Sequence, residues 1–322
     1  MQHQSSRPTV VAHSQNFLTS SALVHRLLAA STIQPGALVL DLGAGRGIMT
    51  DRLANWGCKV IAVEKDARLA SHLRTRFAQT PCVQVRQCDV LLVPLPHCPY
   101  KVFSNIPFDA TAGIVNRLTR AEHAPDDAYL VMQREAAERF VGCPQSTLVA
   151  ALTFPWFDTT VVHEFDRRDF VPMPHVEVVM LRLRKRGPPL VAREHAQGYR
   201  DFVVHVFTAP TSSVGKSLKL LLGKRNGARL AQGLYVADAT PSQTRPSEWV
   251  ELFGSARRLV GDELKWRVGY AERRLQEQHR RLHKVHRTRA RRLRPPPQAC
   301  DARGAEGTKV VRALSGTAWR NA

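Results

Sequence analysis

Residues 37–47, with the sequence ALVLDLGAGRG, are the stretch from which the fold can be argued. The first six residues form an apolar run typical of a buried strand, and a helical pattern follows Gly47. Between them, Asp41 precedes glycines spaced G-x-G-x-G, whereas dinucleotide-binding loops use G-x-G-x-x-G. Glycines let the backbone turn tightly and approach a ligand where a helix begins. The loop therefore predicts a site for a nucleotide-like molecule other than a dinucleotide.

Outward from this loop, strand-like runs alternate with helical ones between residues 35 and 183. We expect strands at 37–42, 59–64, 83–87, 101–105, 128–133, 159–165 and 176–183. Helical patterns include 48–56, 66–77 and a segment that starts at Arg134. This alternation predicts an α/β fold, a Rossmann-like sheet with helices on both faces. The last two strands lack a helix-length connection, which predicts an antiparallel edge.

The proline-containing segment 185–190 (KRGPPL) separates the expected α/β domain, residues 1–184, from a region without strand signals. Helical patterns begin at residues 199, 214, 227 and 247, so a small all-α domain is expected over residues 190–261. Ser247 follows Pro246 and is the expected N-cap of the fourth helix. Residues 262–322 are expected to continue as a basic helix and to be disordered after the three prolines at 295–297.

The net charge of +20 belongs almost entirely to the C-terminal half of the chain. Residues 1–180 hold 17 Lys and Arg against 16 Asp and Glu, whereas residues 181–322 hold 30 against 11. Such an asymmetry indicates a polyanionic partner and favours nucleic acid. A solvated basic tail that only aids solubility is the alternative.

Several classes of protein are disfavoured by features that the sequence lacks. No run of eighteen apolar residues exists, so no membrane span is expected. The N-terminus has no apolar signal core, which predicts a cytoplasmic location. The six cysteines form no C-x-x-C pair and no Cys–His set with ligand spacing, so we expect reduced thiols and no metal site.

Carboxylates also stand at the ends of the next two expected strands. Glu64 ends the second strand, where a carboxylate can bind both hydroxyls of a ribose. Asp89 follows the third strand and can accept a hydrogen bond from an adenine amino group. Each acid alone could be a solvated loop residue, but acids at three successive strand ends, Asp41 included, favour one shared ligand.

The fourth expected strand runs into residues 100–109, with the sequence YKVFSNIPFD. Pro107 ends strand pairing and restricts Ile106, so the turn presents the amide of Asn105 and the ring of Phe108. The amide oxygen and a neighbouring carbonyl can hold the hydrogens of an aromatic amine out of the ring plane. The freed lone pair can then attack a sulfonium methyl in line, with positioning rather than a base as the catalytic effect. An ordinary turn with Asn as a cap is the alternative.

Three motifs together resemble one family of enzymes. NIPF at 105–108 resembles the N-[IL]-P-[YF] motif of adenine-N6 methyltransferases. HSQNFL at 13–18 and FVPMPHV at 170–176 are similar to segments of the branch that contains Erm 23S rRNA methyltransferases and small-subunit rRNA adenine dimethyltransferases. The glycine loop resembles the first motif of S-adenosylmethionine-dependent methyltransferases. The match covers roughly residues 13–183 and implies that fold, with S-adenosyl-L-methionine as the cofactor.

The resemblance implies roles for individual residues. Residues expected at the cofactor are Asn16, Leu18, Gly43, Gly45, Glu64, Asp89 and Asn105. The catalytic turn comprises Asn105, Ile106, Pro107 and Phe108. Phe170 is expected to form, with Phe108, an aromatic clamp on an adenine flipped out of its stack. Without the resemblance, Phe170 would be interpreted as a core aromatic residue before a proline-rich turn.

The basic C-terminal region suggests contacts with RNA phosphates. Gly215-Lys-Ser217 is not a P-loop, because Pro210 stands where that motif requires glycine. The expected phosphate contacts are Lys216, Lys219, Lys224 and Arg225, with a solvated helix face as the alternative. The Arg-rich segment 273–294 is expected to add salt-dependent affinity with little sequence preference.

The resemblance implies an Erm-type enzyme that methylates N6 of one adenine in the peptidyl-transferase loop of 23S rRNA, as a monomer. Resistance to macrolide, lincosamide and streptogramin B antibiotics would follow. A 16S rRNA adenine dimethyltransferase is an alternative, but Ile106 and the Arg-rich tail favour the Erm type. A non-catalytic RNA-binding protein is another alternative, disfavoured by the intact set of site residues. The glycine spacing disfavours a nicotinamide dehydrogenase.

Overall fold

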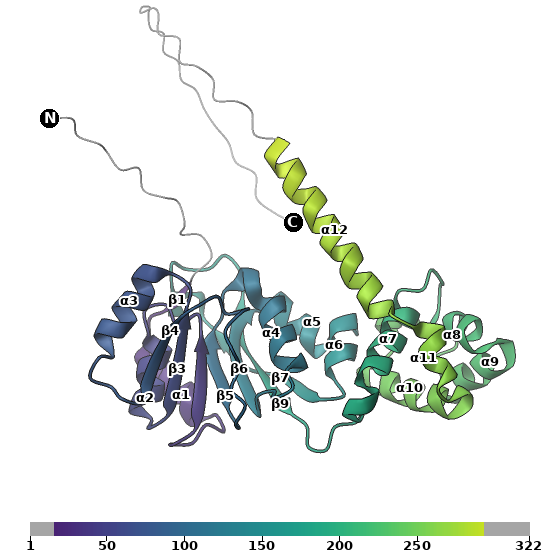
Figure 1. Cartoon of the computed structure of the whole chain (residues 1–322), viewed down its shortest axis with the longest axis horizontal. Coiled ribbons are helices and arrows are strands. Elements are labelled where there is room, and N and C mark those ends of the chain that lie inside the picture. The colour runs from purple at the N-terminus through teal and green to yellow at the C-terminus, as the bar shows by residue number, and fades with distance from the viewer. Residues whose placement is uncertain (1–15, 293–322) are drawn as a thin grey trace, which may run out of the picture. The chain divides into compact units, whose positions relative to one another are not determined.

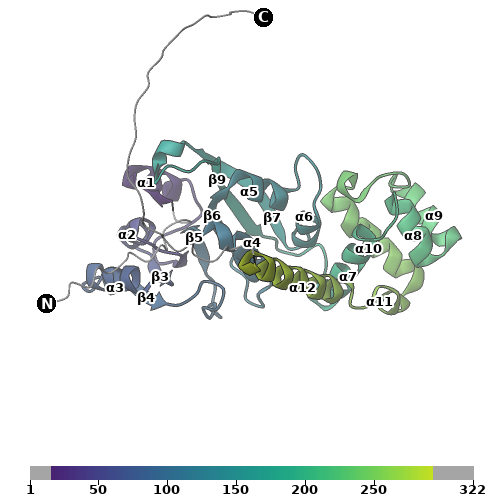
Figure 2. The ribbon, with the colours of Figure 1, turned by 90° about the horizontal axis from the view of Figure 1, so that it is seen from above.

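The computed structural model describes residues 16–292, and the burial of side chains as far as Arg281. The described residues up to Leu275 form one compact unit, which holds a strand-and-helix part followed along the chain by helices (Figure 1). In both views the later helices group together at the end of this unit away from strands β3 and β4 (Figures 1 and 2). Among the described residues, no helix is long and apolar enough to cross a membrane.

A seven-stranded sheet has the order β4-β3-β2-β5-β6-β9-β7. Its strands are β2 (Leu38–Leu42), β3 (Lys59–Glu64), β4 (Val83–Gln87), β5 (Lys101–Asn105), β6 (Asp127–Gln133), β7 (Phe157–Phe165) and β9 (Val178–Lys185). The first five strands in this order run parallel, and β9 runs antiparallel to both of its neighbours. The expected Rossmann-like sheet with an antiparallel edge is therefore confirmed.

Helices cover both faces of the sheet, as the alternation predicts. The helices of this part are α1 (Ser21–Ala29), α2 (Ile48–Asn55), α3 (Ala67–Arg76), α4 (Thr111–Arg120), α5 (Arg134–Val141) and α6 (Leu148–Thr153). Leu40 and Leu42 share a core with α4 and α5, whereas Val39, which precedes Leu40, shares the opposite core with α1 and α2. This division follows from the period of two in a strand, which sends successive side chains to opposite faces.

A second, two-stranded sheet joins two motifs that lie far apart in the sequence. The strands β1 (Phe17–Leu18) and β8 (Phe170–Val171) pair antiparallel, with Leu18 opposite Phe170. Thr19 extends the pairing, because its backbone N–H donates to the Asp169 carbonyl at 2.9 Å. The segment around QNFL is thereby fixed beside the segment FVPMPHV, and both are held near the carboxyl ends of the parallel strands.

The later helices have a hydrophobic core of their own. They are α7 (Ala196–Phe207), α8 (Val214–Leu222), α9 (Lys224–Gly233), α10 (Pro246–Val260) and α11 (Glu263–Val268). Fully buried aromatic side chains such as Tyr199, Phe202 and Trp249 fill its centre. Leu264 and Val268 of α11 belong to the same core. The four helices expected in this region are present, and the packed core continues beyond residue 261.

Two expectations for the C-terminal region are wrong in detail. Helix α10 starts at Pro246, because a proline suits the first helical position, and Arg245 rather than Ser247 is the N-cap. Glu248 accepts the Arg245 backbone N–H at 2.7 Å. The basic helix from Asp262 is interrupted before α12 (Ala271–Arg292), where Tyr270 has a φ of 57°. The expected disorder after the prolines lies outside the described residues.

Candidate active site

The glycine loop between β2 and α2 brings three motifs into contact. Gly43 and Gly45 have φ values of 78° and 55°, which side chains of L-residues rarely tolerate. A Cβ on Gly43 would lie 3.0 Å from the ring of Pro107, and a Cβ on Gly45 would lie 2.7 Å from the ring of Phe17. The loop therefore touches both the NIPF turn and the N-terminal segment, and there is no room for side chains at either glycine.

The carboxylate of Glu64 is hydrogen-bonded to the backbone of this loop. Its side chain is buried, with one carboxylate oxygen accepting the Gly45 N–H at 2.8 Å and the other accepting the Asp66 N–H at 2.9 Å. A carboxylate oxygen has more than one lone pair, so each can accept a further hydrogen bond. Glu64 thus fixes the shape of the loop in addition to the ribose contact that the sequence predicts.

Asp89 is an ionised acceptor at the end of β4. One carboxylate oxygen accepts the Leu91 N–H at 2.9 Å, and the other forms an ion pair with the Lys65 ammonium at 2.8 Å. The hydrogen bond from Lys65, and then that from Leu91, lowers the pKa of the Asp89 carboxyl. The residue therefore carries a full charge at neutral pH, as an acceptor for an amino group requires.

Asp41 does not share this exposed arrangement. Its side chain is fully buried and accepts the Thr50 hydroxyl at 2.7 Å, which ties the end of β2 to α2. Burial, with a further contribution from the charge of Glu64, raises the pKa of Asp41 to about 7. Asp41 is therefore a residue that shapes the loop, and it is not available to a ligand in this structure.

The turn after β5 leaves two oxygen atoms available as acceptors. The Asn105 side-chain N–H donates to the Asn16 backbone carbonyl at 2.7 Å, so its amide oxygen faces away from that contact. The Ile106 N–H donates to the Val131 carbonyl at 3.2 Å, which fastens the turn to β6. Within the described residues, no donor reaches the Asn105 amide oxygen or the Ile106 carbonyl. These two oxygens are free to be the acceptor pair that the sequence predicts, and that role stays a prediction.

A small pocket of about 20 Å³ lies at this turn. Its lining residues are Asn16, Phe17, Gly43, Asn105, Ile106, Pro107 and Phe108. A pocket of that size holds about one water-sized group. None of the seven lining side chains titrates, which agrees with catalysis by positioning. The structure thus brings Asn16, Gly43 and the whole NIPF turn together.

The expected role of Phe170 is not supported by its position. The ring is only 1% exposed and packs edge-on against Phe165 at 5.4 Å between centroids. A residue that stacks on a base must expose a ring face, so the interpretation of Phe170 as a core aromatic is the one that holds here. Its strand partner Leu18 is also buried, at 5% exposure. Phe108, which is half-buried and lines the pocket, is the aromatic side chain at the turn.

Phe17 is a site residue that the sequence reasoning missed. Its ring lies against Gly45, and the Arg46 guanidinium is 5.0 Å from the ring centroid. Side chains alternate along a strand, so a buried Leu18 places Phe17 on the opposite side, toward the loop. The alternation of side-chain directions within QNFL is the sequence signal that indicates Phe17.

The four cations expected to contact RNA lie around helices α8 and α9, all of them exposed. Lys216, Lys219 and Lys224 line a surface groove of about 750 Å³. Pro210, Leu220 and Ala228 contribute apolar surface to the same groove. Arg225 follows Lys224 at the start of α9. Their grouping is compatible with a phosphate-binding surface, and their roles stay a prediction.

The fold and this site together define a class. A parallel sheet that carries a glycine loop after β2, carboxylates after β3 and β4, and an N-I-P-F turn after β5 is the arrangement of an S-adenosylmethionine-dependent methyltransferase. Residues 11–253 match the model of the family described as ribosomal RNA adenine dimethylase. The chain belongs to this family.

Individual relatives agree with that assignment. An rRNA methyltransferase of Streptomyces thermotolerans is 33% identical over 75% of this chain and 81% of its own length. The mycinamicin-resistance protein MyrB of Micromonospora griseorubida is 28% identical over 74% of this chain and 76% of its own length. The crystal structure of the 23S rRNA methyltransferase ErmE is similar with a TM-score of 0.68 and 29% identity, over 75% of this chain and 99% of that one.

Proposed function

We propose that this protein transfers methyl groups from S-adenosyl-L-methionine to N6 of one adenine in the peptidyl-transferase loop of 23S rRNA. The observation that carries the proposal is the pair of unengaged acceptors, the Asn105 amide oxygen and the Ile106 carbonyl, beside the ring of Phe108. The choice of 23S rRNA is supported by the similarity to the 23S rRNA methyltransferase ErmE.

The chemistry of an aromatic amine explains why two acceptors are needed. The lone pair of an exocyclic amino group is delocalised into the ring, so the free amine is a poor nucleophile. The Asn105 oxygen and the Ile106 carbonyl hold its two hydrogens and favour the tetrahedral geometry in which the lone pair is available. Attack by the neutral amine gives a positively charged nitrogen, which then loses a proton, so no general base has to act before the transfer. None of the side chains that line the pocket titrates, which is consistent with this order.

The target base needs a surface that holds it outside its own stack. The half-buried ring of Phe108 can cover one face of an adenine. The Thr111 hydroxyl donates to the Phe108 carbonyl at 3.1 Å, which fixes the backbone that carries this ring. A base that is flipped from an RNA loop loses its stacking neighbours, and an aromatic side chain restores part of that free energy.

The residues present fit S-adenosyl-L-methionine. Gly43 and Gly45 keep the loop free of side chains, Glu64 can accept from ribose hydroxyls, and ionised Asp89 can accept from an adenine amino group. The cofactor, when bound, supplies an electrophilic methyl group on a sulfonium. The protein contributes its placement, because Asn105 belongs both to the turn and to the contact with the N-terminal segment at Asn16.

Methylation at N6 adds bulk and removes one hydrogen-bond donor from the adenine. In the peptidyl-transferase loop this change would weaken the binding of macrolide, lincosamide and streptogramin B antibiotics, so we infer resistance as the cellular outcome. The similarity to the mycinamicin-resistance protein MyrB supports this inference. The RNA contacts at Lys216, Lys219, Lys224 and Arg225 remain part of the proposal.

The choice of RNA can be tested with labelled S-adenosylmethionine. Protein-free 23S and 16S rRNA are offered separately, and the modified base is mapped by primer extension. We expect label at one adenine of the peptidyl-transferase loop in 23S rRNA. Label near the 3′ end of 16S rRNA would contradict the proposal and assign the protein to ribosome assembly, the other activity compatible with the family.

A further inference from the structure

A second pocket, of about 290 Å³, is unusually rich in positive charge. Its cationic lining residues are Arg120, Lys185, Arg186, Arg193 and Arg200. Trp156 and Phe157 are its aromatic lining residues, and Glu122 is the one acidic residue in the lining. The cations come from the end of α4, the end of β9 and the segment just after it, the short helix η3 (Arg193–His195), and α7. The pocket therefore draws together charges from elements that are separate in the sequence.

This pocket lies at one end of the sheet's strands, and the catalytic turn lies at the other end. The turn follows the last residue of β5, whereas Arg184 near the end of β9 pairs with Asp127, the first residue of β6. The Lys185 N–H donates to the Asp126 carbonyl at 2.9 Å, just before β6 begins. Along β5, Asn105 lies four residues from Lys101, the residue that pairs with Asp127. The two ends of the strands are therefore about 13 Å apart at ~3.3 Å per residue. The pocket is thus separate from the methyl-transfer site.

Several of the pocket cations are only partly neutralised. The nearest carboxylate oxygens lie 3.7 Å from Lys185, on Asp126, and 3.6 Å from Arg186, on Asp158. Arg193 donates to the Glu122 backbone carbonyl, which carries no full charge. These contacts orient the side chains and leave most of their positive charge uncompensated.

Arg120 and Arg200 are the remaining two cations of the pocket, and they add to its excess of positive charge. Arg120 pairs with the buried Glu272. The Arg200 guanidinium lies 4.9 Å from the centroid of the Trp156 ring and forms no ion pair among the described residues. Burial, and then the charge of Arg120, lowers the pKa of Arg200. The carboxylates of Glu272 and Asp201 act in the opposite direction but do not cancel this effect, so an anion beside the two guanidiniums would be stabilised.

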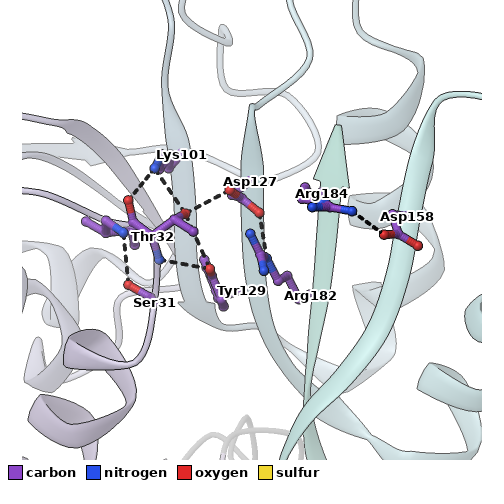
Figure 3. A network of polar contacts seen from close by, with 9 residues as sticks. Ser31, Thr32, Lys101, Asp127, Tyr129, Asp158, Arg182 and Arg184 are labelled. Atoms are coloured by element: carbon purple, nitrogen blue, oxygen red, sulfur yellow. Dashed lines mark hydrogen bonds and ion pairs between the residues drawn. The ribbon is translucent and has the colours of Figure 1, made fainter. Parts of the chain in front are cut away.

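Two other arginines at the same end of the strands form short ion pairs with aspartates. Figure 3 shows Arg182 bonded to Asp127 and Arg184 bonded to Asp158, with N···O distances of 2.7 Å in each case. Lys101 in the same network donates to Thr32. The incompletely paired positive charge is therefore specific to the pocket and is not shared by all cations at this end of the strands.

We propose that this pocket binds a backbone phosphate of the RNA substrate, at a second contact opposite the catalytic turn. The inference rests on the proposed function for the class of its ligand. Helix α4 connects the two places, since it begins just after the NIPF turn and ends at Arg120. It contains no acidic residue, and its exposed side includes Ala112, Gly113 and Asn116. Along α4 itself no carboxylate repels an RNA strand, since the nearest acidic residues in the sequence, Asp109 and Glu122, lie before and after the helix. This connection to the catalytic turn favours RNA over a free small anion.

The test compares the RNA affinity of matched pairs of variants. The pocket pair R193Q/R200Q removes two pocket charges, and R193K/R200K keeps them. The control pair R74Q/R139Q removes two charges from exposed side chains outside the pocket lining. The probe is a 23S rRNA fragment with the peptidyl-transferase loop, titrated at several salt concentrations. Thermal unfolding checks that each variant is folded.

We expect the pocket pair to bind RNA about 10-fold more weakly, with a salt-dependence slope smaller by about 1 to 2. The lysine pair should recover most of the affinity, and the control pair should match the wild type. Equal affinities for the pocket and control pairs would overturn the proposal. So would a thermal shift with pyrophosphate that the pocket pair loses while RNA affinity stays intact, because the ligand would then be a free anion.

The result stays distinct from that of the methylation assay. If the wild-type protein methylates neither rRNA but the pocket pair still lowers RNA affinity relative to the control pair, the phosphate contact is supported and the proposed function fails. If methylation occurs and the two pairs bind RNA equally, the proposed function stands and the pocket inference fails.

Discussion

The side chain of Asn105 is oriented by a backbone carbonyl and not by another side chain. Its N–H donates to the Asn16 carbonyl, which leaves its oxygen for the substrate. At the residue scale, the chemistry therefore depends on one amide and on the segment that holds it. The same scale separates Phe108, which lines the site, from Phe170, which is buried in the core.

The two phenylalanines should respond differently to truncation. Phe108→Ala should lower kcat/KM for RNA by about 5- to 150-fold through lost stacking, with little change in Tm, and Phe108→Tyr should recover most of it. Phe170→Ala should instead lower the unfolding free energy by about 3 to 5 kcal/mol, because it empties a packed site. Steady-state kinetics and denaturant unfolding distinguish these outcomes. A Phe170→Ala enzyme of normal stability but low kcat/KM would restore the clamp that the sequence predicts.

Burial of Asp41 predicts a pH dependence of stability. Its pKa is about 7 in the folded protein, against an ordinary value of 3.8. The folded state then holds this proton more tightly, so the unfolding free energy falls as pH rises from about 4 to about 7. Asp41→Asn cannot ionise and should remove this fall. The Tm of the variant should therefore gain on that of the wild type between pH 4 and pH 8, and parallel profiles would contradict the argument.

Residue types at strand ends could be predicted from the sequence, but the directions of their side chains could not. Asn105, Phe108, Glu64 and Gly43 lie where the motifs predict them, because each follows a strand whose end is fixed by its apolar run. The burial of Phe170 arises from its pairing with β1, about 150 residues earlier in the chain. No local pattern carries that contact. Asp41 differs, because its carboxylate turns inward to the Thr50 hydroxyl only nine residues later.

At the scale of elements, the site is a junction of four segments. The glycine loop after β2, the turn after β5 and the β1–β8 pair meet within a few ångströms, and β6 holds the turn from its other side. The bounds of β3, β4 and β5 agree with the sequence prediction; β3 and β5 contain buried apolar runs, whereas β4 alternates valines with polar residues. The N-cap of α10 lies two positions before the expected Ser247, because Pro246 itself is the first helical residue.

A pair of glycine variants can separate backbone strain from contact at this junction. Gly43 and Gly36 both have φ near 80°, but a Cβ would meet Pro107 at 3.0 Å in the first case and nothing within 4 Å in the second. Each alanine variant should lose about 1 to 2 kcal/mol of stability through strain. Only Gly43→Ala should also displace the turn, with at least a 10-fold loss of methyl transfer. Equal activities of the two variants, measured alongside denaturant unfolding, would show that the loop does not control the turn.

At the scale of the whole molecule, the packed helical core of the C-terminal region extends beyond residue 261, and the strongly basic segment follows Leu275. Leu264 and Val268 belong to the core of the later helices, so we propose that this domain includes α11. Beyond Leu275, the chain holds 12 Lys and Arg against 3 Asp and Glu. The basic composition of this segment supports a role in RNA affinity and not in folding of the catalytic part.

Two truncations test this division. Ending the chain after Gly261 removes Leu264 and Val268, which are 2% and 1% exposed, and should cost about 1.5 to 3 kcal/mol for each of these side chains. Ending it after Leu275 should leave Tm unchanged but weaken RNA binding and reduce its salt dependence. Unfolding curves and RNA titrations measure both effects. Unchanged RNA affinity at physiological salt after the truncation that removes only residues 276–322 would show that this segment does not contribute to RNA binding.

The most direct measurement is single-turnover methyl transfer to a 23S rRNA fragment, with cofactor and RNA both saturating. Asn105→Ala removes the acceptor oxygen, and Asn55→Ala removes an amide of the same type from the exposed end of α2. The account predicts a rate loss of about 10²- to 10³-fold for Asn105→Ala and a wild-type rate for Asn55→Ala. A rate for Asn105→Ala within about threefold of the wild type would contradict the central role of the turn.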